Sequence, residues 1–272
     1  MTKIPRVLTI AGSDSGGGAG IQADLKTFCA FGVYGMSVIT AATAQNTLRV
    51  NGVEPLSPDF VSLQFESILS DIGVDAVKTG MLFSADIIDR VAQKLKENKI
   101  LHVVVDPVML AKGGDPLLQA SAVEMLKNYL IPQASLVTPN IPEAEVLAEM
   151  TIETNSHVME AALKIHKLGC KAVLIKGGHL PGDATDVLFD GDHFWSFEEK
   201  RIDSRNTHGT GCTYSSAIAA NLAKGHSLKE AVTISKAFIT EAIRQAFNLG
   251  KGHGPLNHFV RVKGMEGCPN QN

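Results

Sequence analysis

Short apolar runs rich in β-branched residues recur along the chain and alternate with segments of helical periodicity. Most of these runs are bounded by Gly, Pro, Asp or Asn, which is typical of buried parallel strands rather than half-exposed antiparallel ones. The runs cover residues 7–11, 37–42, 74–78, 102–106, 135–138 and 171–176. The segments in which apolar residues have helical spacing cover 19–31, 60–69, 85–95, 120–130 and 157–168.

This alternation predicts right-handed βαβ units and hence a three-layer α/β/α fold, with helices on both faces of a mostly parallel sheet. The pattern changes over residues 187–202, where two short apolar and aromatic runs flank Asp190-Gly191. Because Asp-Gly between such runs favours a tight turn, we expect a small antiparallel hairpin at one edge of the sheet. Two further helices, over 211–224 and 228–247, follow the hairpin.

The sequence gives no sign of a division into domains. Its hydrophobic content of 44% is ample for a large core, and no repeat, low-complexity block or linker interrupts it. We therefore predict that residues 1–272 form a single domain. The segment from Asn248 onward is rich in Gly, Asn and Pro, and we expect a flexible tail from about residue 260.

Charge and cysteine content exclude several classes of protein. The net charge is −3, from 25 basic and 28 acidic residues, which gives no basic surface for nucleic acid or membrane binding. No apolar run is long enough for a membrane span, and no secretory signal is recognisable. The cysteines show no C-x-x-C pair and are expected to be reduced thiols; they are Cys29, Cys170, Cys212 and Cys268. We expect a cytoplasmic protein that acts on small molecules.

Polar and glycine-rich clusters follow the predicted strands. They cover residues 12–20, 44–47, 80–81, 106–114, 139–143 and 177–179. In open α/β sheets, ligands bind beyond the carboxyl ends of the strands. We therefore expect these clusters to line one cleft along one edge of the sheet.

One of the most informative segments is Asn206-Thr207-His208-Gly209-Thr210-Gly211-Cys212-Thr213, which precedes a helix-forming run. A glycine-rich turn that opens a helix lets backbone N–H groups converge on an anion, and the helix dipole adds positive potential. At this position the pKa of the Cys212 thiol is expected to be lowered, which makes it a candidate proton acceptor. Taken alone, the segment also fits an ordinary helix start with a flexible entry loop.

Residues 11–20 form a second glycine-rich segment, Ala-Gly-Ser-Asp-Ser-Gly-Gly-Gly-Ala-Gly. It does not end in the Gly-Lys-Ser/Thr of a Walker A loop, and it fits the dinucleotide-binding pattern only loosely. A long mobile turn and a loop that contacts a substrate remain equally open interpretations.

Carboxylates, an amide and a lysine follow three of the predicted strands. Asp106 ends one strand, and Asn140 and Glu143 follow another with the spacing of a helix capping box. These oxygens are also suited to hydrated Mg²⁺, which needs only one or two carboxylates besides phosphates and water. Lys176 ends a further strand and is either a cation for a nucleotide phosphate or a surface lysine. Together with the glycine-rich turn, these groups form a set typical of phosphoryl transfer.

With these motifs the chain resembles the ribokinase-like superfamily, whose signature ends in Gly-Ala-Gly-Asp with the aspartate as general base. Here Cys212 stands at the aspartate position. The branch that carries Gly-x-Gly-Cys comprises the bacterial hydroxymethylpyrimidine and phosphomethylpyrimidine kinases. Residues 5–259 resemble this branch in the motifs AGSDSGGGAGIQADLKTF from Ala11, TAQNT from Thr43, VKTGML from Val77, DPVMLAKGGD from Asp106, TPNIPEAE from Thr138 and LIKGGH from Leu174.

The resemblance implies two ATP- and Mg²⁺-dependent steps of thiamin biosynthesis in one site. The hydroxymethyl of 4-amino-5-hydroxymethyl-2-methylpyrimidine is phosphorylated first, and its monophosphate is then converted to the diphosphate. It also implies a homodimer and a set of site residues. These are Gln45, the backbone near Ala19, and Met81 for the pyrimidine; Lys176, Thr207, Gly209 and Gly211 for ATP; Asp106, Asn140 and Glu143 for the metal; and Cys212, Gly209, Gly211 and Lys176 for catalysis.

The main alternative is a pyridoxal or pyridoxine kinase of the same branch. Some of those enzymes carry a cysteine in the loop after Asp-Pro-Val, whereas residues 109–114 here contain none. The absence of that cysteine, together with Gln45, favours the pyrimidine over pyridoxal as the substrate. A nucleotide-binding regulator that has lost catalysis is disfavoured by the intact Asp106, Glu143 and Lys176. Residues 16–20 and 112–115 are the candidates for a loop that closes over the site.

Overall fold

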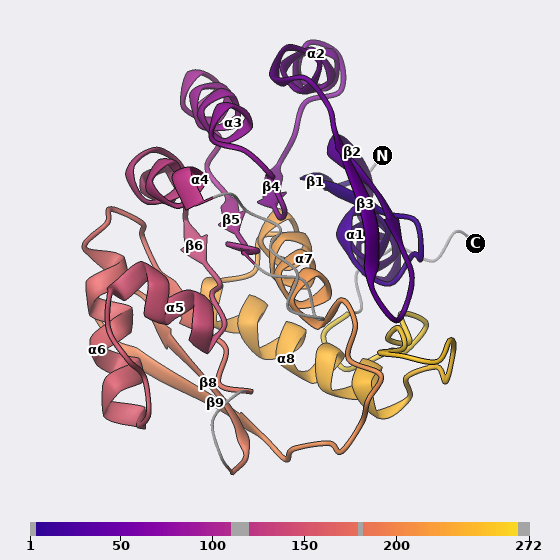
Figure 1. Cartoon of the computed structure of the whole chain (residues 1–272). Coiled ribbons are helices and arrows are strands. Elements are labelled where there is room, and N and C mark those ends of the chain that lie inside the picture. The colour runs from indigo at the N-terminus through magenta and orange to yellow at the C-terminus, as the bar shows by residue number, and fades with distance from the viewer. Residues whose placement is uncertain (1–3, 110–119, 179–181, 266–272) are drawn as a thin grey trace.

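A nine-stranded sheet in the order β3-β2-β1-β4-β5-β6-β7-β8-β9 forms the middle layer of the structure (Figure 1). The structure is a computed structural model, and it describes residues 4–109, 120–178 and 182–265. The strands are β1 (Arg6–Asp14), β2 (Tyr34–Gln45), β3 (Val50–Pro55), β4 (Ala76–Thr79), β5 (Val103–Val105), β6 (Leu136–Val137), β7 (Val173–Ile175), β8 (Ala184–Phe189) and β9 (Phe194–Glu199).

The inner strands are parallel and the edges are antiparallel. Strands β2, β1, β4, β5, β6 and β7 pair in parallel, whereas β3 at one edge and β8 and β9 at the other pair antiparallel. The predicted strands and the hairpin at Asp190-Gly191 are confirmed. The antiparallel strand β3 was not predicted, because most of its side chains are exposed and its sequence lacks an apolar pattern.

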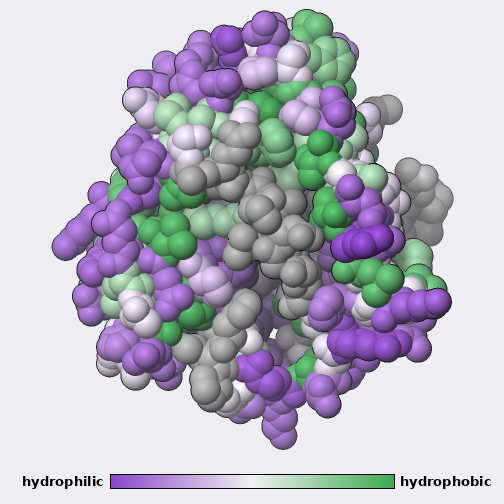
Figure 2. All heavy atoms as spheres, viewed as in Figure 1, coloured by the Kyte–Doolittle hydropathy of each residue, from purple (hydrophilic) through white to green (hydrophobic). Residues whose placement is uncertain are grey.

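Helices cover both faces of the sheet, which confirms the predicted α/β/α layers. One face packs against α2 (Pro58–Leu69), α3 (Ala85–Glu97), α4 (Ala120–Met125), α5 (Ile141–Ala148) and α6 (Asn155–His166). The other face packs against α1 (Gly20–Ala30), α7 (Thr210–Ala223) and α8 (Leu228–Arg244). A π-helical turn (Leu126–Leu130) and a 3-10 turn (Ile131–Gln133) extend α4. In the space-filling view, hydrophilic side chains dominate the outline of the molecule (Figure 2).

The end of the chain packs further than the sequence suggests. A flexible tail was expected from about residue 260, but Val260 and Met265 are buried against the α7–α8 side of the core. The Nζ of Lys224 also donates to the carbonyl of Met265 at 3.4 Å. The apolar contacts of these two residues with α7 and α8 outweigh the local richness in Gly, Asn and Pro. The single-domain organisation stays a prediction.

A buried ion pair joins the sheet to the helices on the α1–α7 side. The side chains of Lys78 and Asp24 are fully buried, and Nζ of Lys78 lies 2.9 and 3.0 Å from the two carboxylate oxygens. Thr9 and Ser216 donate to the same carboxylate at 2.6 and 2.7 Å. The pair therefore ties β1, β4, α1 and α7 together at one point.

We predict that Lys78→Met lowers the free energy of unfolding by about 3–5 kcal/mol, because it leaves the carboxylate of Asp24 buried without its counter-ion. Urea denaturation followed by circular dichroism measures the change. Arg90→Ala is the control: it removes the exposed pair of Arg90 and Asp59, and exposed pairs contribute little to stability. Equal losses in the two variants would contradict the prediction.

Candidate active site

A cavity of about 660 Å³ lies beyond the carboxyl ends of the parallel strands. Each cluster that follows a predicted strand contributes to its wall, and representative residues are Gly12, Gln45, Met81, Asp106, Glu143 and Gly178. The sequence therefore placed one cleft at this edge of the sheet correctly. Residues 110–114 and 179 of these clusters, and the candidate closing loop 112–115, lie outside the described residues.

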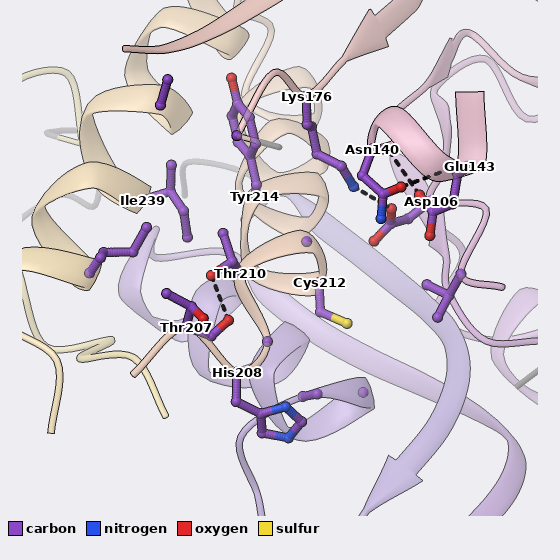
Figure 3. Close-up of a pocket in the computed structure, with 18 of the residues that line it drawn as sticks. Asp106, Asn140, Glu143, Lys176, Thr207, His208, Thr210, Cys212, Tyr214 and Ile239 are labelled. Atoms are coloured by element: carbon purple, nitrogen blue, oxygen red, sulfur yellow. Dashed lines mark hydrogen bonds and ion pairs between the residues drawn. The ribbon is translucent and has the colours of Figure 1, made fainter. Parts of the chain in front are cut away.

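The structure brings every predicted site residue to this cavity. The lining includes Cys212, Gly209, Gly211, Lys176, Thr207, Gln45, Ala19, Met81, Asp106, Asn140 and Glu143. Figure 3 shows Cys212 projecting from the start of α7 on the side away from Ile239. Their individual roles in binding and catalysis stay predictions.

The start of α7 lines the cavity and has no side-chain cap; of its first N–H groups, that of Thr210 donates to the carbonyl of Thr207 at 3.3 Å. Five helices begin with a side-chain cap, formed by Ser57, Ser84, Asn140, Thr154 and Ser227. Helices α1 and α7 instead begin at Ala19 and Gly209, where no described side chain caps the helix. The first N–H groups of a helix have no intrahelical acceptor and attract anions. Three of the described helix starts line the cavity, those of α1, α5 and α7, and of these only α5 has a side-chain cap.

Two glycines at the start of α7 occupy positions where a side chain would collide with neighbouring backbone or enter the cavity. Gly209 has φ +80°, and a Cβ there would lie 1.8 Å from the carbonyl oxygen of Gly18. A Cβ on Gly211 would lie 3.3 Å from Nζ of Lys176 and 3.4 Å from Oδ2 of Asp106. The space in front of Gly211 is therefore bounded by backbone N–H groups, a lysine and a carboxylate.

Lys176 and Asp106 form an ion pair at this point. Nζ of Lys176 lies 2.9 Å from Oδ1 of Asp106 (Figure 3). Ser215 of α7 donates to Oδ2 of Asp106 at 3.2 Å. Burial alone lowers the pKa of Lys176, but the charges of Asp106 and Glu143 outweigh it and raise the pKa above its usual value. Lys176 is thus a protonated cation inside the cavity and not a surface lysine.

Asn140 and Glu143 form the capping box that their spacing allowed. Oδ1 of Asn140 accepts from the N–H of Glu143 at 2.9 Å, and Oε2 of Glu143 accepts from the N–H of Asn140 at 2.9 Å. Burial raises the pKa of Glu143 to about 7. The charge of Asp106 also raises this pKa, whereas the charge of Lys176 lowers it. Over the described residues, no group of three or more His, Cys, Asp or Glu could hold a metal alone. The two acids suit a cation that phosphates help to bind.

Cys212 differs from its prediction in acidity. The helix start was expected to lower the pKa of its thiol, but burial raises the pKa to about 11. The charge of Lys78 and the backbone N–H of Gly20 act in the opposite direction without cancelling the burial. The half-buried thiol faces Gly20 in the loop of residues 12–20, and with this pKa it is protonated at neutral pH.

The predicted pyrimidine-binding residues are held by their neighbours. Thr43 donates to Oε1 of Gln45 at 3.2 Å. Met81 is buried, and its methyl group packs so closely against Gly12 that a Cβ on that residue would lie only 2.4 Å from it. The backbone N–H of Ala19 already donates to Oδ2 of Asp14 at 2.9 Å. A ligand that binds next to Ala19 therefore finds the N–H of this residue already bonded within the protein.

Several residues that line the cavity were missed by the sequence analysis. Asp14 and His208 stand inside motifs that it quoted, but nothing in the sequence indicated that they contact each other. Lys236 of α8 and Asp186 of β8 form a buried ion pair at 2.7 Å, next to Tyr214. Buried charges in otherwise apolar segments were the available signal for this second pair.

The chain matches the family model described as phosphomethylpyrimidine kinase over residues 14–257. It is 57% identical to the thiamine biosynthesis bifunctional protein ThiED of Geobacter sulfurreducens over 94% of the chain, but spans only 53% of that protein. It is 50% identical to the hydroxymethylpyrimidine/phosphomethylpyrimidine kinase of Bacillus subtilis, over 94% of this chain and 96% of that one.

Solved structures of related kinases superpose on this fold. Phosphomethylpyrimidine kinase from Clostridium difficile superposes with a TM-score of 0.80 at 49% identity, over 89% of this chain and all of that one. An ADP complex of pyridoxal kinase from Bacillus subtilis superposes with a TM-score of 0.87 at 44% identity, over 94% of this chain and 98% of that one. No helix in the described part of the chain is long and apolar enough to cross a bilayer.

We predict that iodoacetamide modifies Cys29 faster than Cys212 at about pH 8, because Cys29 is exposed and the Cys212 thiol is mostly protonated. Since the raised pKa keeps the thiolate a minor species, the rate at Cys212 should rise about tenfold per pH unit between about pH 7 and pH 9.5. Peptide mass spectrometry measures both rates. A rate at Cys212 that levels off near neutral pH would show an acidic thiol instead.

Proposed function

The chain belongs to the phosphomethylpyrimidine kinase family, and we propose that its cavity carries out both phosphorylations of thiamin biosynthesis. The protein is a phosphotransferase that acts first on 4-amino-5-hydroxymethyl-2-methylpyrimidine and then on its monophosphate, as the relatives' names indicate. The observation that carries the assignment to this cavity is the start of α7. Its N–H groups face Lys176 and Asp106 across a space that the missing side chain of Gly211 leaves open.

The cavity has two ends that suit two reactants. Gln45, 3.4 Å from Nε2 of His208, and Met81, packed against Gly12, line the cavity beside the loop of residues 12–20, where an amide and an apolar wall suit an aminopyrimidine ring. Tyr214, Ile239 and Ile243 line the other end, where they suit a nucleotide base. The start of α7 lies between them and would bind the phosphoryl group during transfer, assisted by Lys176 and the backbone from Thr207 to Gly211.

ATP is the proposed phosphoryl donor, and Mg²⁺ is the proposed metal. The ADP complex of the Bacillus pyridoxal kinase supports a nucleotide in this fold. Asp106 and Glu143 would hold the metal with Asn140 near them, since buried carboxylates 
of like charge favour a divalent cation. The metal would neutralise charge on the phosphates. Lys176 would keep one ion-pair partner in Asp106 and face the transferred phosphoryl group.

Cys212 is proposed to orient the substrate hydroxyl. Because its thiol is protonated at neutral pH, it acts mainly as a hydrogen-bond partner of the hydroxyl. Only the minor thiolate form, whose proton has gone to solvent, accepts the hydroxyl proton late in the reaction and becomes the thiol again. A loose phosphoryl-transfer transition state requires little early removal of that proton. Lys78 is the nearby charge that favours the thiolate when it forms.

Phosphorylation of pyridoxal is the second candidate activity. The close superposition on pyridoxal kinases supports it, as a side activity in the same cavity. The cysteine-free loop that argues against it lies partly outside the described residues.

We also propose a cytoplasmic homodimer, following the family resemblance, and a sedimentation profile of a monomer would overturn the dimer.

We predict that Mg·ATP and the aminopyrimidine alcohol yield the diphosphate when purified protein is assayed by mass spectrometry. The monophosphate should give the same product, and pyridoxal should give less product than the alcohol. Both pyrimidine steps are expected because the acceptor end and the phosphoryl site are parts of one cavity. Pyridoxal phosphate as the sole product would assign the protein to vitamin B6 metabolism.

We predict that Cys212→Ala lowers kcat at least about a hundredfold, the usual contribution of a positioned proton acceptor. The Kd for the ATP analogue AMP-PCP should change little, because backbone N–H groups and Lys176 bind the phosphates. Steady-state kinetics and calorimetry measure the two quantities. An unchanged kcat would remove the proposed role of the thiol, and Cys29→Ala serves as the control at an exposed cysteine.

A further inference from the structure

The carboxylate of Asp14 organises the glycine-rich loop of residues 12–20. Its Oδ1 accepts from the N–H of Gly16 at 2.8 Å, and its Oδ2 accepts from Gly18 at 3.1 Å and Ala19 at 2.9 Å. Asp14 is 3% exposed. Burial alone raises the pKa of this carboxyl, but the hydrogen bonds from His208 and the backbone lower it below its usual value. The loop is therefore folded around a carboxylate.

His208 reaches the same carboxylate from the other glycine-rich segment. Its Nε2 lies 2.8 Å from Oδ2 of Asp14, although the two residues are 194 positions apart in the chain. The backbone N–H of His208 donates to the carbonyl of Gly254 at 3.1 Å, which fixes the position of the residue. The next residue, Gly209, begins α7. One side-chain contact thus links the loop to the proposed phosphoryl site.

The two segments also pack without free space between them. A Cβ on Gly18 would lie 2.4 Å from Cδ2 of His208, and a Cβ on Gly209 would lie 1.8 Å from the carbonyl oxygen of Gly18. Segments packed this closely leave no room for the loop to move toward α7 while the start of α7 stays in place. A shift of the loop toward α7 must be accompanied by a shift at the start of α7.

We propose that Asp14 is a positioning residue that couples the binding of the acceptor alcohol to the binding of the nucleotide. The inference rests on the proposed function, which places the alcohol near Gln45 and the phosphates at Gly209 and Gly211, and on the contact with the backbone near Ala19 that the family resemblance implies. An alcohol that orders the loop also orders the N–H groups of α7, through Asp14 and His208. By linkage, each ligand then tightens the binding of the other.

Calorimetry of AMP-PCP with Mg²⁺, in the absence and in the presence of saturating aminopyrimidine alcohol, measures the coupling. In the natural protein the alcohol should lower the Kd of AMP-PCP at least about fivefold, the lower end of typical coupling. In Asp14→Asn the two Kd values should agree within about twofold. The substitution keeps the size of the side chain but brings an NH₂ group against backbone donors.

The matched control is Lys26→Ala. Nζ of Lys26 donates to the carbonyl of Gly17 at 2.7 Å, an exposed contact with the same loop that involves neither Asp14 nor His208. This variant should keep the coupling of the natural protein. His208→Leu should lose it, whereas His208→Gln, which offers an amide nitrogen near the position of Nε2, should restore part of it.

A coupling ratio in Asp14→Asn and His208→Leu equal to that of the natural protein would overturn the proposal, as would a natural protein without coupling. General destabilisation weakens both ligands alike and leaves the ratio unchanged, so it cannot imitate the expected result. The two hypotheses fail differently: a natural protein that binds AMP-PCP but not the alcohol contradicts the proposed function itself.

Discussion

Buried polar side chains that point to different sides of α7 are the constraint on which the rest of the site depends. Four consecutive residues of this helix each contact a different polar partner. Thr213 bonds His258 at 2.9 Å, Tyr214 lies beside Asp186, Ser215 bonds Asp106 at 3.2 Å and Ser216 bonds Asp24 at 2.7 Å. These contacts fix the helix in rotation and in height over the sheet. Its open N-terminus, with Gly209 to Cys212, is consequently held at the carboxyl ends of the strands.

The same contacts place several ion pairs around the cavity. Lys176 pairs with Asp106 and Lys236 with Asp186 in the cavity wall, and Lys78 pairs with Asp24 behind Cys212, all with side chains at most 14% exposed. Buried pairs carry a desolvation penalty that often offsets their attraction, so they contribute little net stability. Their frequency around one cavity is better explained by binding of a highly charged reactant. The pairs hold the cations in place before the phosphates arrive, which suits electrostatic catalysis.

The sequence predicted what depends on local pattern. The inner strands, the helices between them and the Asp190-Gly191 hairpin follow from periodicity and turn chemistry. The positions of Asp106, Asn140 and Lys176 follow because carboxyl ends of parallel strands meet at one edge. The contact of Asp14 with His208 was not predictable, since it joins loops 194 positions apart. The acidity of Cys212 was predicted wrongly, because burial is a property of the assembled fold.

The central claim is that the N–H groups at the start of α7 bind the phosphoryl group in transfer. Amide chemical shifts of ¹⁵N-labelled protein test it most directly, with ADP, Mg²⁺, aluminium fluoride and the aminopyrimidine alcohol present together. The account predicts that the amides from Gly209 to Cys212 shift strongly with this transition-state mimic and much less with AMP alone. Unchanged signals there, alongside shifts at Lys176 or Gln45, would contradict it.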